Sequence, residues 1–283
     1  MSDKKLVNWL FKTGAVRVCP EGKPFWYTSG TIGPYYINTH FLYGSEKKAN
    51  ELLEAIDAFK SDKLGCPDKL LNIIEANYAK DEIFKGLIGS MLEYINDNIE
   101  IADIDYISGG ERRDWFFSLI LAKLLQKPHI TIYKDLASVI TEKGETFEVQ
   151  SVNGARVLHI ADLITEASSY ERAWIPAIKN ISGQMTHSLV VVDRLQGGCE
   201  LLERNNVCSF ALVSIDKDFF DSVLGLKLIN EGQYEMLLKY ASNPRESMKA
   251  FLNAHPEFLE NALKADNKTS ERARLCIEKK IYA

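Results

Sequence analysis

Short apolar runs alternate with segments of helical periodicity between residues 104 and 215, and this alternation limits the possible folds more than any other feature. The apolar runs occupy residues 104–108, 129–133, 155–161, 188–193 and 209–215. Helical spacing predicts helices over residues 114–125 and 169–180. Short apolar strands separated by helices are typical of a parallel sheet that is covered on both faces. We therefore expect an α/β fold with a central parallel sheet flanked by helices.

The strongest candidate site is the segment VLHIADLITEASSYERAW, residues 157–174. In parallel sheets ligands bind at the carboxyl ends of the strands, and this strand is expected to end at Ala161 and Asp162. Thr165, Ser168 and Ser169 follow in a tight turn that opens a helix, where hydroxyls and free N–H groups bind phosphate. A carboxylate at the strand end can bind ribose hydroxyls or a hydrated Mg²⁺. These residues alone leave open the alternative that one of the serines is only an N-cap.

The rest of the chain is predicted to be mostly helical. Residues 4–12, 46–61 and 68–98 have helical spacing, residues 18–38 suggest short strands and turns, and residues 135–153 are polar and expected to be irregular. Five more helices are expected after residue 217, at residues 219–230, 231–241, 244–253, 256–264 and 268–280. Pro244 and Pro256 stand where two of them would begin.

Composition excludes several classes of protein. With 46% apolar and 26% charged residues the chain can form an ordinary globular core. A net charge of −5 does not favour electrostatic binding of nucleic acid. The five cysteines are odd in number and form no CxxC pair, so we expect reduced thiols rather than disulfides or structural zinc. The N-terminal segment is predicted to be an amphipathic helix rather than a signal peptide, and no window approaches the ~18 apolar residues of a membrane span. We expect a cytoplasmic protein with no nucleic-acid or membrane partner.

Residues 157–174 resemble the phosphoribosyl pyrophosphate (PRPP) signature of type I phosphoribosyltransferases, in which an apolar strand and two acids precede a Thr/Gly/Ser-rich loop. Here the acidic pair is Ala161-Asp162, so only the second acid is present. The loop is residues 165–169, where Glu166 and Ala167 stand in place of a small or hydroxyl residue and Gly.

Three further segments resemble the orotate branch of this family, in the same order along the chain. SGTIGPYYIN (29–38) is similar to its N-terminal SGxxSPYYxN signature. ISGGERRDWFFSLILA (107–122) resembles its GPxxKG turn, and VVVDRLQGG (190–198) resembles its strand that ends in DRxxGG. The resemblance covers roughly residues 10–44 and 104–210, and it implies a type I phosphoribosyltransferase fold with an N-terminal hood and a C-terminal helical appendage. Residues 45–103 are longer than is usual in the family.

The resemblance also implies roles for individual residues. For PRPP binding it indicates Arg113, Lys134, Asp162, Thr165, Ser168 and Ser169. For the base it indicates Tyr36, Ile37 and Arg194, and for Mg²⁺ it indicates Asp162. The residues themselves leave plainer alternatives open: Arg194 as a surface arginine, Arg113 as part of a solvated cluster, and Tyr36 as packing. His159 and the aromatic residues 115–117 are expected to lie in the core.

The sequence departs from the family at the mobile loop, where the family has an RKxxKxH run. The matching stretch, residues 133–139, keeps only Lys134, because the loop lysine falls on Ala137 and the histidine on Val139. Lys143 is the candidate replacement, so Lys134, Lys143 and Asp162 are the expected catalytic residues. Residues 135–153 would close over the site as a lid.

We therefore predict a phosphoribosyltransferase-like domain at residues 1–216 and a C-terminal helical extension at residues 217–283. The domain would consist of a hood (1–44), a helical insertion (45–103) and a core (104–216). The predicted activity is transfer of ribose 5-phosphate from PRPP to a pyrimidine base, orotate first, with Mg²⁺ and release of pyrophosphate, by a homodimer. Open alternatives are a transferase for another base, a non-catalytic regulatory protein that binds PRPP or a nucleotide, and a fold retained only for assembly.

Overall fold

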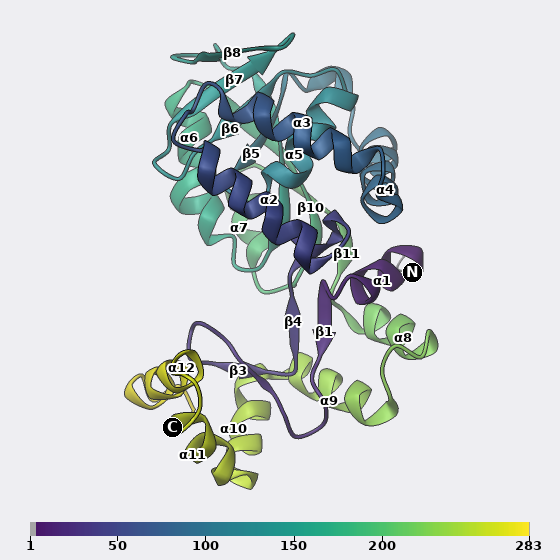
Figure 1. Cartoon of the computed structure of the whole chain (residues 1–283), viewed down its shortest axis with the longest axis vertical. Helices are drawn as coiled ribbons and strands as arrows, with labels where there is room; N and C mark the ends of the chain where they lie inside the picture. The colour runs from purple at the N-terminus through teal and green to yellow at the C-terminus, as the bar shows by residue number, and fades with distance from the viewer. Residues whose placement is uncertain (1–3, 283) are drawn as a thin grey trace. The chain divides into compact units, whose positions relative to one another are not determined.

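A seven-stranded sheet forms the centre of the larger of two compact units, which comprises Lys12–Gly14 and Thr39–Ile215 (Figure 1). The computed structural model describes residues 4–282. The strands of the sheet are β5 (Tyr106–Gly110), β6 (His129–Ile132), β7 (Ser138–Glu142), β8 (Glu145–Glu148), β9 (Arg156–Ile164), β10 (Gln184–Asp193) and β11 (Cys208–Ser214). Their order is β11-β10-β9-β5-β6-β7-β8. Strands β11 to β6 are parallel, which confirms the predicted parallel sheet, and β7 and β8 extend it with antiparallel pairing.

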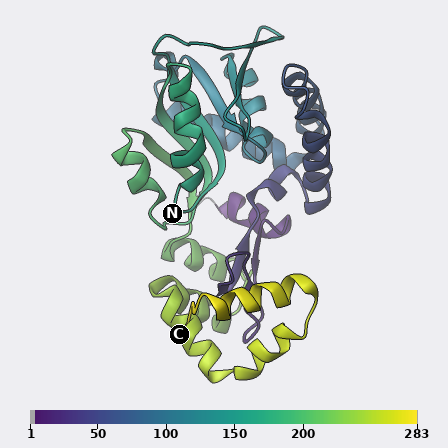
Figure 2. The same cartoon turned by 90° about the vertical axis from the view of Figure 1, so that its left-hand side faces the viewer.

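Helices cover both faces of this sheet (Figures 1 and 2). They are α2 (Glu46–Phe59), α3 (Cys66–Tyr78), α4 (Glu82–Asn98), α5 (Trp115–Leu124), α6 (Ile175–Asn180) and α7 (Gly198–Arg204), with 3-10 turns at Thr39–Tyr43 and Ile101–Asp103 and a π-helical turn at Tyr170–Trp174. Helix α5 is apolar on all sides and its residues 115–122 are buried, so the predicted core position of the three aromatics at its start is confirmed. Helix α6 packs with the turn before it against the face of β9 that carries Val157 and Ala161.

The strand order reverses at β5, because the chain goes from β5 to β6 on one side and later to β9 on the other. Strands β5 and β9 are paired from Tyr106 to Ser108, and the last pair is Ser108 with His159. Beyond that pair β5 continues to Gly110 and β9 continues to Ile164. Ligands bind in the crevice at such a switch point.

Residues 135–153 are not irregular, which corrects the sequence-based expectation. They contain a β-hairpin in which β7 pairs along β6, from Ile132 with Ser138 to His129 with Thr141. The turn is Lys143-Gly144, and both residues have positive φ, 52° and 85°. The two strands of this hairpin are only five and four residues long, so their strand pattern was missed in the sequence. The hairpin shields the edge of β6 from solvent.

Two other elements also differ from the expectation. Strand β9 does not end at Ala161 and Asp162 but continues to Ile164, so Asp162 lies within a strand. The segment that was expected to be only a link contains helix α7, which begins after Gly197 in the left-handed region at φ 91°. The apolar stripe of this seven-residue helix is too short to stand out in the sequence.

The second unit combines the two ends of the chain, Met1–Phe11, Ala15–Asn38 and Asp216–Ala283. Its elements are α1 (Lys4–Lys12), β1 (Val16–Val18), β2 (Phe25–Trp26), β3 (Ile32–Gly33), β4 (Tyr35–Ile37), α8 (Lys217–Gly225), α9 (Glu231–Ser242), α10 (Pro244–Ala254), α11 (Pro256–Leu263) and α12 (Asn267–Glu278). All five predicted C-terminal helices are present. Strands β1 and β4 form one antiparallel pair, and β2 and β3 form another.

Aromatic packing joins the hood to the C-terminal helices inside this unit. Trp26 stacks on Phe258 with ring centroids 5.7 Å apart, and Tyr35 packs edge-on against Tyr240 at 5.8 Å. Arg272 donates a hydrogen bond of 2.8 Å to the carbonyl of Trp26. Hood residues 15–38 therefore belong to the same unit as residues 216–283. The sequence analysis instead assigned the hood, residues 1–44, to the same domain as the core and treated residues 217–283 as a separate extension. The short hood strands have little core of their own, and the helices supply it.

The five cysteines are free thiols, and no helix among residues 4–282 is long and apolar enough to cross a membrane.

Candidate active site

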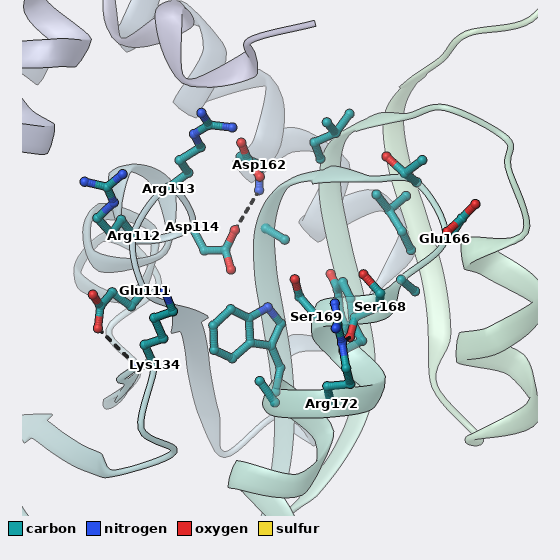
Figure 3. A pocket seen from close by; sticks show the side chains of 18 of the residues that line it. Glu111, Arg112, Arg113, Asp114, Lys134, Asp162, Glu166, Ser168, Ser169 and Arg172 are labelled. Atoms are coloured by element: carbon teal, nitrogen blue, oxygen red, sulfur yellow. Dashed lines mark hydrogen bonds between the residues drawn. The ribbon is translucent and has the colours of Figure 1, made fainter. Parts of the chain in front are cut away.

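A cavity of about 930 Å³ lies in the larger unit at the carboxyl ends of β5, β6 and β9. Its wall contains five acidic and five basic side chains together with the predicted phosphate loop and Trp174. The acids are Asp57, Glu111, Asp114, Asp162 and Glu166, and the bases are Lys60, Arg112, Arg113, Lys134 and Arg172. Of the predicted PRPP ligands, all six line this one cavity: Arg113, Lys134, Asp162, Thr165, Ser168 and Ser169. Figure 3 labels five of these six residues, all but Thr165, and shows them around the cavity.

The predicted phosphate loop forms one end of the cavity. Ala167 has φ 54°, the left-handed conformation that glycine adopts without strain, so the backbone keeps a glycine-like bend at a position where the family has Gly. Ser168 and Ser169 are exposed, and the side chain of Ser169 makes no capping bond to the helical turn that follows it. Arg172 on that turn donates to the carbonyl of Ser168 at 3.2 Å, which brings a cation beside the two hydroxyls (Figure 3).

Two carboxylates lie at the centre, where β5 and β9 separate. Asp114 is 6% exposed; its Oδ2 accepts from the Gly110 N–H at 3.1 Å, and its Oδ1 accepts from the Asp162 N–H at 3.1 Å. The Asp114 carboxylate therefore links the two strand ends. Burial raises the pKa of Asp162, and the negative charge of Asp114 raises it further, while Arg113 acts in the opposite direction. A positive charge near Asp162 lowers the pKa of its carboxyl group and so favours the ionised form.

Cations gather at the end opposite the phosphate loop. Arg113 is exposed, and Lys134 lies beside Glu111, whose Oε2 accepts from the Lys134 backbone N–H at 3.0 Å (Figure 3). Arg112 forms an ion pair with Asp57. The field of this cluster reaches a buried neighbour: burial lowers the pKa of His40 to about 3, and the charges of Arg113 and Arg112 contribute to the same shift.

Close packing at two glycines shapes the floor of the cavity. A Cβ on Gly110 would lie 2.4 Å from ring atoms of Trp174, and a Cβ on Gly109 would lie 2.1 Å from the Ser118 hydroxyl. No side-chain carbon fits at either distance, so only glycine permits this approach. The Trp115 indole N–H donates to the Gly109 carbonyl at 3.0 Å and holds the turn from below.

His159 is buried directly beneath the carboxylates, which confirms its predicted core position. Its Nδ1 lies 2.9 Å from the Ser108 hydroxyl, and its Nε2 lies 3.5 Å from Asp114 Oδ2. Its ring packs edge-on against Tyr170 at 5.1 Å. Among the described residues its Nε2 has no hydrogen-bond partner, and His159 does not line the cavity.

The four other predicted residues lie outside this cavity. Arg194 follows β10 and donates its backbone N–H to Ile164 at 3.0 Å, so it lies next to the end of β9. Lys143 is at the tip of the β7–β8 hairpin, beyond His129, which is the opposite end of β6 from Lys134. Within one chain it is thus not brought to the cavity. Tyr36 and Ile37 belong to β4 of the other unit, where the Tyr36 hydroxyl donates to the Trp26 carbonyl.

Sequence reasoning gave no role to several residues of the cavity wall, among them Asp57, Lys60, Asp114, Arg172 and Trp174. Asp114 and Arg172 stand within or beside the recognised motifs and could have been noted as charges close to them. Asp57 and Lys60 lie on α2, nearly 50 residues before the first motif in the core. No local pattern marks them, because only the packing of α2 brings them to the site.

A magnesium ion fits this site only in combination with a ligand. Among residues 4–282 no group of three or more His, Cys, Asp or Glu side chains is arranged to hold a metal. Asp162 supplies one carboxylate in the cavity, with Asp114 behind it. Mg²⁺ is commonly bound by one or two carboxylates together with phosphate oxygens and water.

The amino-acid sequence matches no protein-family model and no curated protein. Solved structures match the fold. UMP synthase from Leishmania donovani superposes with a TM-score of 0.57 at 14% identity, over 84% of this chain and 42% of that one, so this chain spans less than half of its length. Orotate phosphoribosyltransferase from Aeropyrum pernix gives 0.51 at 21% identity, over 78% of this chain and 99% of that one. The enzyme from Francisella tularensis gives 0.52 at 14% identity, over 83% and 96%.

The sheet, its flanking helices and these matches together define a type I phosphoribosyltransferase fold. Within that fold, the chain is similar to orotate phosphoribosyltransferases.

Proposed function

We propose that this protein is a phosphoribosyltransferase that transfers ribose 5-phosphate from PRPP to a pyrimidine base, with orotate as the first candidate. One observation carries the proposal: a single cavity has hydroxyls and Arg172 at one end, Arg113 and Lys134 at the other, and the carboxylates of Asp114 and Asp162 between them. PRPP has the matching form, with a 5-phosphate at one end, a pyrophosphate at the other and ribose hydroxyls in the middle.

Each end of the cavity suits one group of PRPP. Thr165, Ser168 and Ser169 would bind the 5-phosphate through hydroxyls and backbone N–H groups. Arg113 and Lys134 would bind the pyrophosphate. Asp162 would accept hydrogen bonds from the ribose hydroxyls or bind the Mg²⁺ that accompanies PRPP, and either contact favours its ionised form. Mg²⁺ would neutralise charge on the pyrophosphate.

The transfer breaks the bond between ribose C1 and a pyrophosphate oxygen and forms a bond between C1 and a ring nitrogen of the base. The electron pair leaves with pyrophosphate, and the ring nitrogen loses its proton. Positive charge develops on the ribose, as in glycoside hydrolysis. The protein's part is to align both substrates and to stabilise the departing charge with Arg113 and Lys134.

The base site is proposed at the carboxyl end of β10, where Arg194 would pair with a carboxylate on the base. Its backbone bond to Ile164 keeps it beside the end of the strand that carries Asp162. For Tyr36 and Ile37, contact with the base stays a prediction from the sequence resemblance. The protein is proposed to act as a homodimer, in which the Lys143 hairpin serves as a lid for the partner's site.

A non-catalytic PRPP-binding protein is the second candidate, and specific observations favour it. Ala161 replaces one acid of the motif, Ala137 replaces the lid lysine, and Lys143 is remote from the cavity of its own chain. Loss of one group that stabilises developing charge costs roughly 10²–10³ in rate. Such a protein would keep the cavity and its affinity for PRPP without turnover.

The test is to measure pyrophosphate release from Mg²⁺ and PRPP with and without orotate, and PRPP affinity by calorimetry in parallel. Release that depends on orotate is the expected result for the transferase. PRPP binding without release on any pyrimidine base would favour the second candidate. Absence of PRPP binding would refute both.

A further inference from the structure

Helix α2 brings two charged residues, Asp57 and Lys60, to the end of the cavity that is proposed for pyrophosphate. This helix lies in residues 45–103, a segment that the sequence resemblance does not cover. Asp57 and Lys60 are one helical turn apart, so both face the same side of α2. This segment therefore forms part of the site wall.

Several contacts fix the end of α2 and the turn after it against the segment after β6, which carries Lys134. The Tyr133 hydroxyl donates to the Lys63 carbonyl at 2.8 Å, and the Lys63 ammonium pairs with Asp135 at 2.5 Å. Tyr133 is 1% exposed, so the side chain that donates the first of these hydrogen bonds is buried. Arg112 and Asp57 add a third connection, between the turn after β5 and α2. The position of Lys60 relative to the cavity is thus determined by packed elements rather than by a loop.

Lys60 reaches the same carboxylate that holds Lys134. Its Nζ lies 2.6 Å from Asp57 Oδ1 and 3.4 Å from Glu111 Oε1, while Glu111 Oε2 accepts from the Lys134 backbone N–H. The Lys60 side chain is 37% exposed, so it keeps access to the cavity. Lys60 lines the same cavity as Arg113 and Lys134, so its ammonium is a further candidate contact for an anion bound by these two residues.

The charges at this end of the cavity favour an anion with more than one negative charge. Four cations, Lys60, Arg112, Arg113 and Lys134, line it together with two carboxylates, Asp57 and Glu111. Asp57 binds both Arg112 and Lys60, so it stays paired with Arg112 when Lys60 turns toward a ligand. Ion pairs with phosphate are stronger than exposed pairs with carboxylate when they are excluded from water.

We propose that Lys60 binds the pyrophosphate group of PRPP and supplies the cation that Ala137 does not. This inference rests on the proposed function and adds a ligand contact from an element outside the recognised motifs. In this proposal Lys60 contacts the pyrophosphate directly and has the role that a lid lysine has in the family. It differs from a lid lysine in that it belongs to the cavity wall and not to a mobile loop.

The test compares three variants by calorimetry in Mg²⁺: Lys60→Met, Lys60→Arg and Lys47→Met. Lys47 lies on the same helix with an 87% exposed side chain, far from the cavity wall, and serves as the matched control. Each variant is titrated with PRPP, with inorganic pyrophosphate and with ribose 5-phosphate. Ribose 5-phosphate lacks the pyrophosphate group, so its affinity reports whether the rest of the site is intact.

For Lys60→Met we expect about tenfold weaker binding of PRPP and pyrophosphate, which is the usual effect of losing one charge-assisted contact. Ribose 5-phosphate affinity should change less than about twofold. Lys60→Arg should keep most of the affinity for all three ligands, and Lys47→Met should match the wild type.

Two results would overturn the inference while the proposed function stands. One is wild-type affinity of Lys60→Met for PRPP and pyrophosphate. The other is an equal loss for all three ligands, since that would mean that Lys60 only supports the fold of the site. If the wild type itself binds neither PRPP nor pyrophosphate, the proposed function fails first, and the inference fails with it.

Discussion

At two positions of the site, Gly110 and Ala167, close packing or backbone conformation restricts which residue fits. Gly110 accepts the Trp174 ring against its backbone, and its own N–H donates to Asp114. Ala167, in contrast, holds a left-handed conformation with a side chain that costs energy there. The strand ends and the phosphate loop are thus set by glycine at one point and by a strained alanine at another.

At this scale we predict that Gly110→Ala damages both stability and binding. The new methyl group would overlap the Trp174 ring, and neither the strand backbone nor the buried indole can move freely. We expect the free energy of unfolding to fall by about 1–3 kcal/mol and PRPP affinity to fall with it. Urea denaturation and PRPP titration measure the two effects.

Gly89→Ala is the matched control for that substitution. Gly89 is exposed on α4, and a Cβ there meets no atom within 4 Å. Replacing glycine in an exposed helix interior is expected to stabilise the protein by roughly 0.5–1 kcal/mol. Unchanged stability of Gly110→Ala would contradict the packing of Trp174 described above.

Elements of the larger unit are joined by buried polar side chains as well as by apolar packing. His129 opens β6, and its Nε2 lies 2.9 Å from the Ser118 hydroxyl of α5 while its Nδ1 lies 2.9 Å from Thr131. Burial lowers the pKa of His129 to about 3, and His159 contributes to the shift. The ring is therefore neutral in the folded protein over the whole physiological range.

The linkage between β6 and α5 predicts a pH dependence of stability. A histidine with a lowered pKa takes up fewer protons in the folded state than in the unfolded state, so its contribution is full above pH ~6.5 and falls as the pH drops toward 3. His129→Gln should lower the free energy of unfolding at pH 8 by about 1–3 kcal/mol through lost hydrogen bonds. The difference between wild type and variant should shrink steadily between pH 7 and pH 5.

Urea denaturation at several pH values measures that difference. Because both proteins share every other titrating group, only the contribution of His129 remains in the comparison. A difference that stays constant from pH 8 to pH 5 would show that His129 is not held neutral by burial.

The chain forms two compact units, and one of them is built from three separate segments. Residues 15–38 and 216–283 come together although nearly 180 residues separate them, and aromatic pairs such as Trp26 with Phe258 join them. Neither segment has a complete core without the other. The C-terminal helices are therefore part of a folded unit rather than an addition to its surface.

Truncation after Ile215 tests this organisation. Removal of residues 216–283 would expose Trp26, Ile32 and Tyr35, which are at most 7% exposed in the full chain. We expect the truncated chain to bind a hydrophobic dye strongly and to self-associate in size-exclusion chromatography. A truncated protein that stays monomeric with wild-type dye binding would mean that the hood carries its own core.

The sequence by itself predicted the parallel sheet and the helices, because apolar periodicity is a local property of the chain. The resemblance of its motifs selected six candidate PRPP ligands, and these six residues line one cavity. Lys143 was predicted to replace the lid lysine, and the register of β7 on β6 puts it at the opposite end of β6 from Lys134. Register, and not distance along the chain, decides which end of a strand a hairpin tip reaches. Only the tertiary structure placed Lys60 at the cavity and joined the hood to the C-terminal helices. Both depend on packing between segments far apart in the sequence, and such contacts leave no pattern in either segment alone.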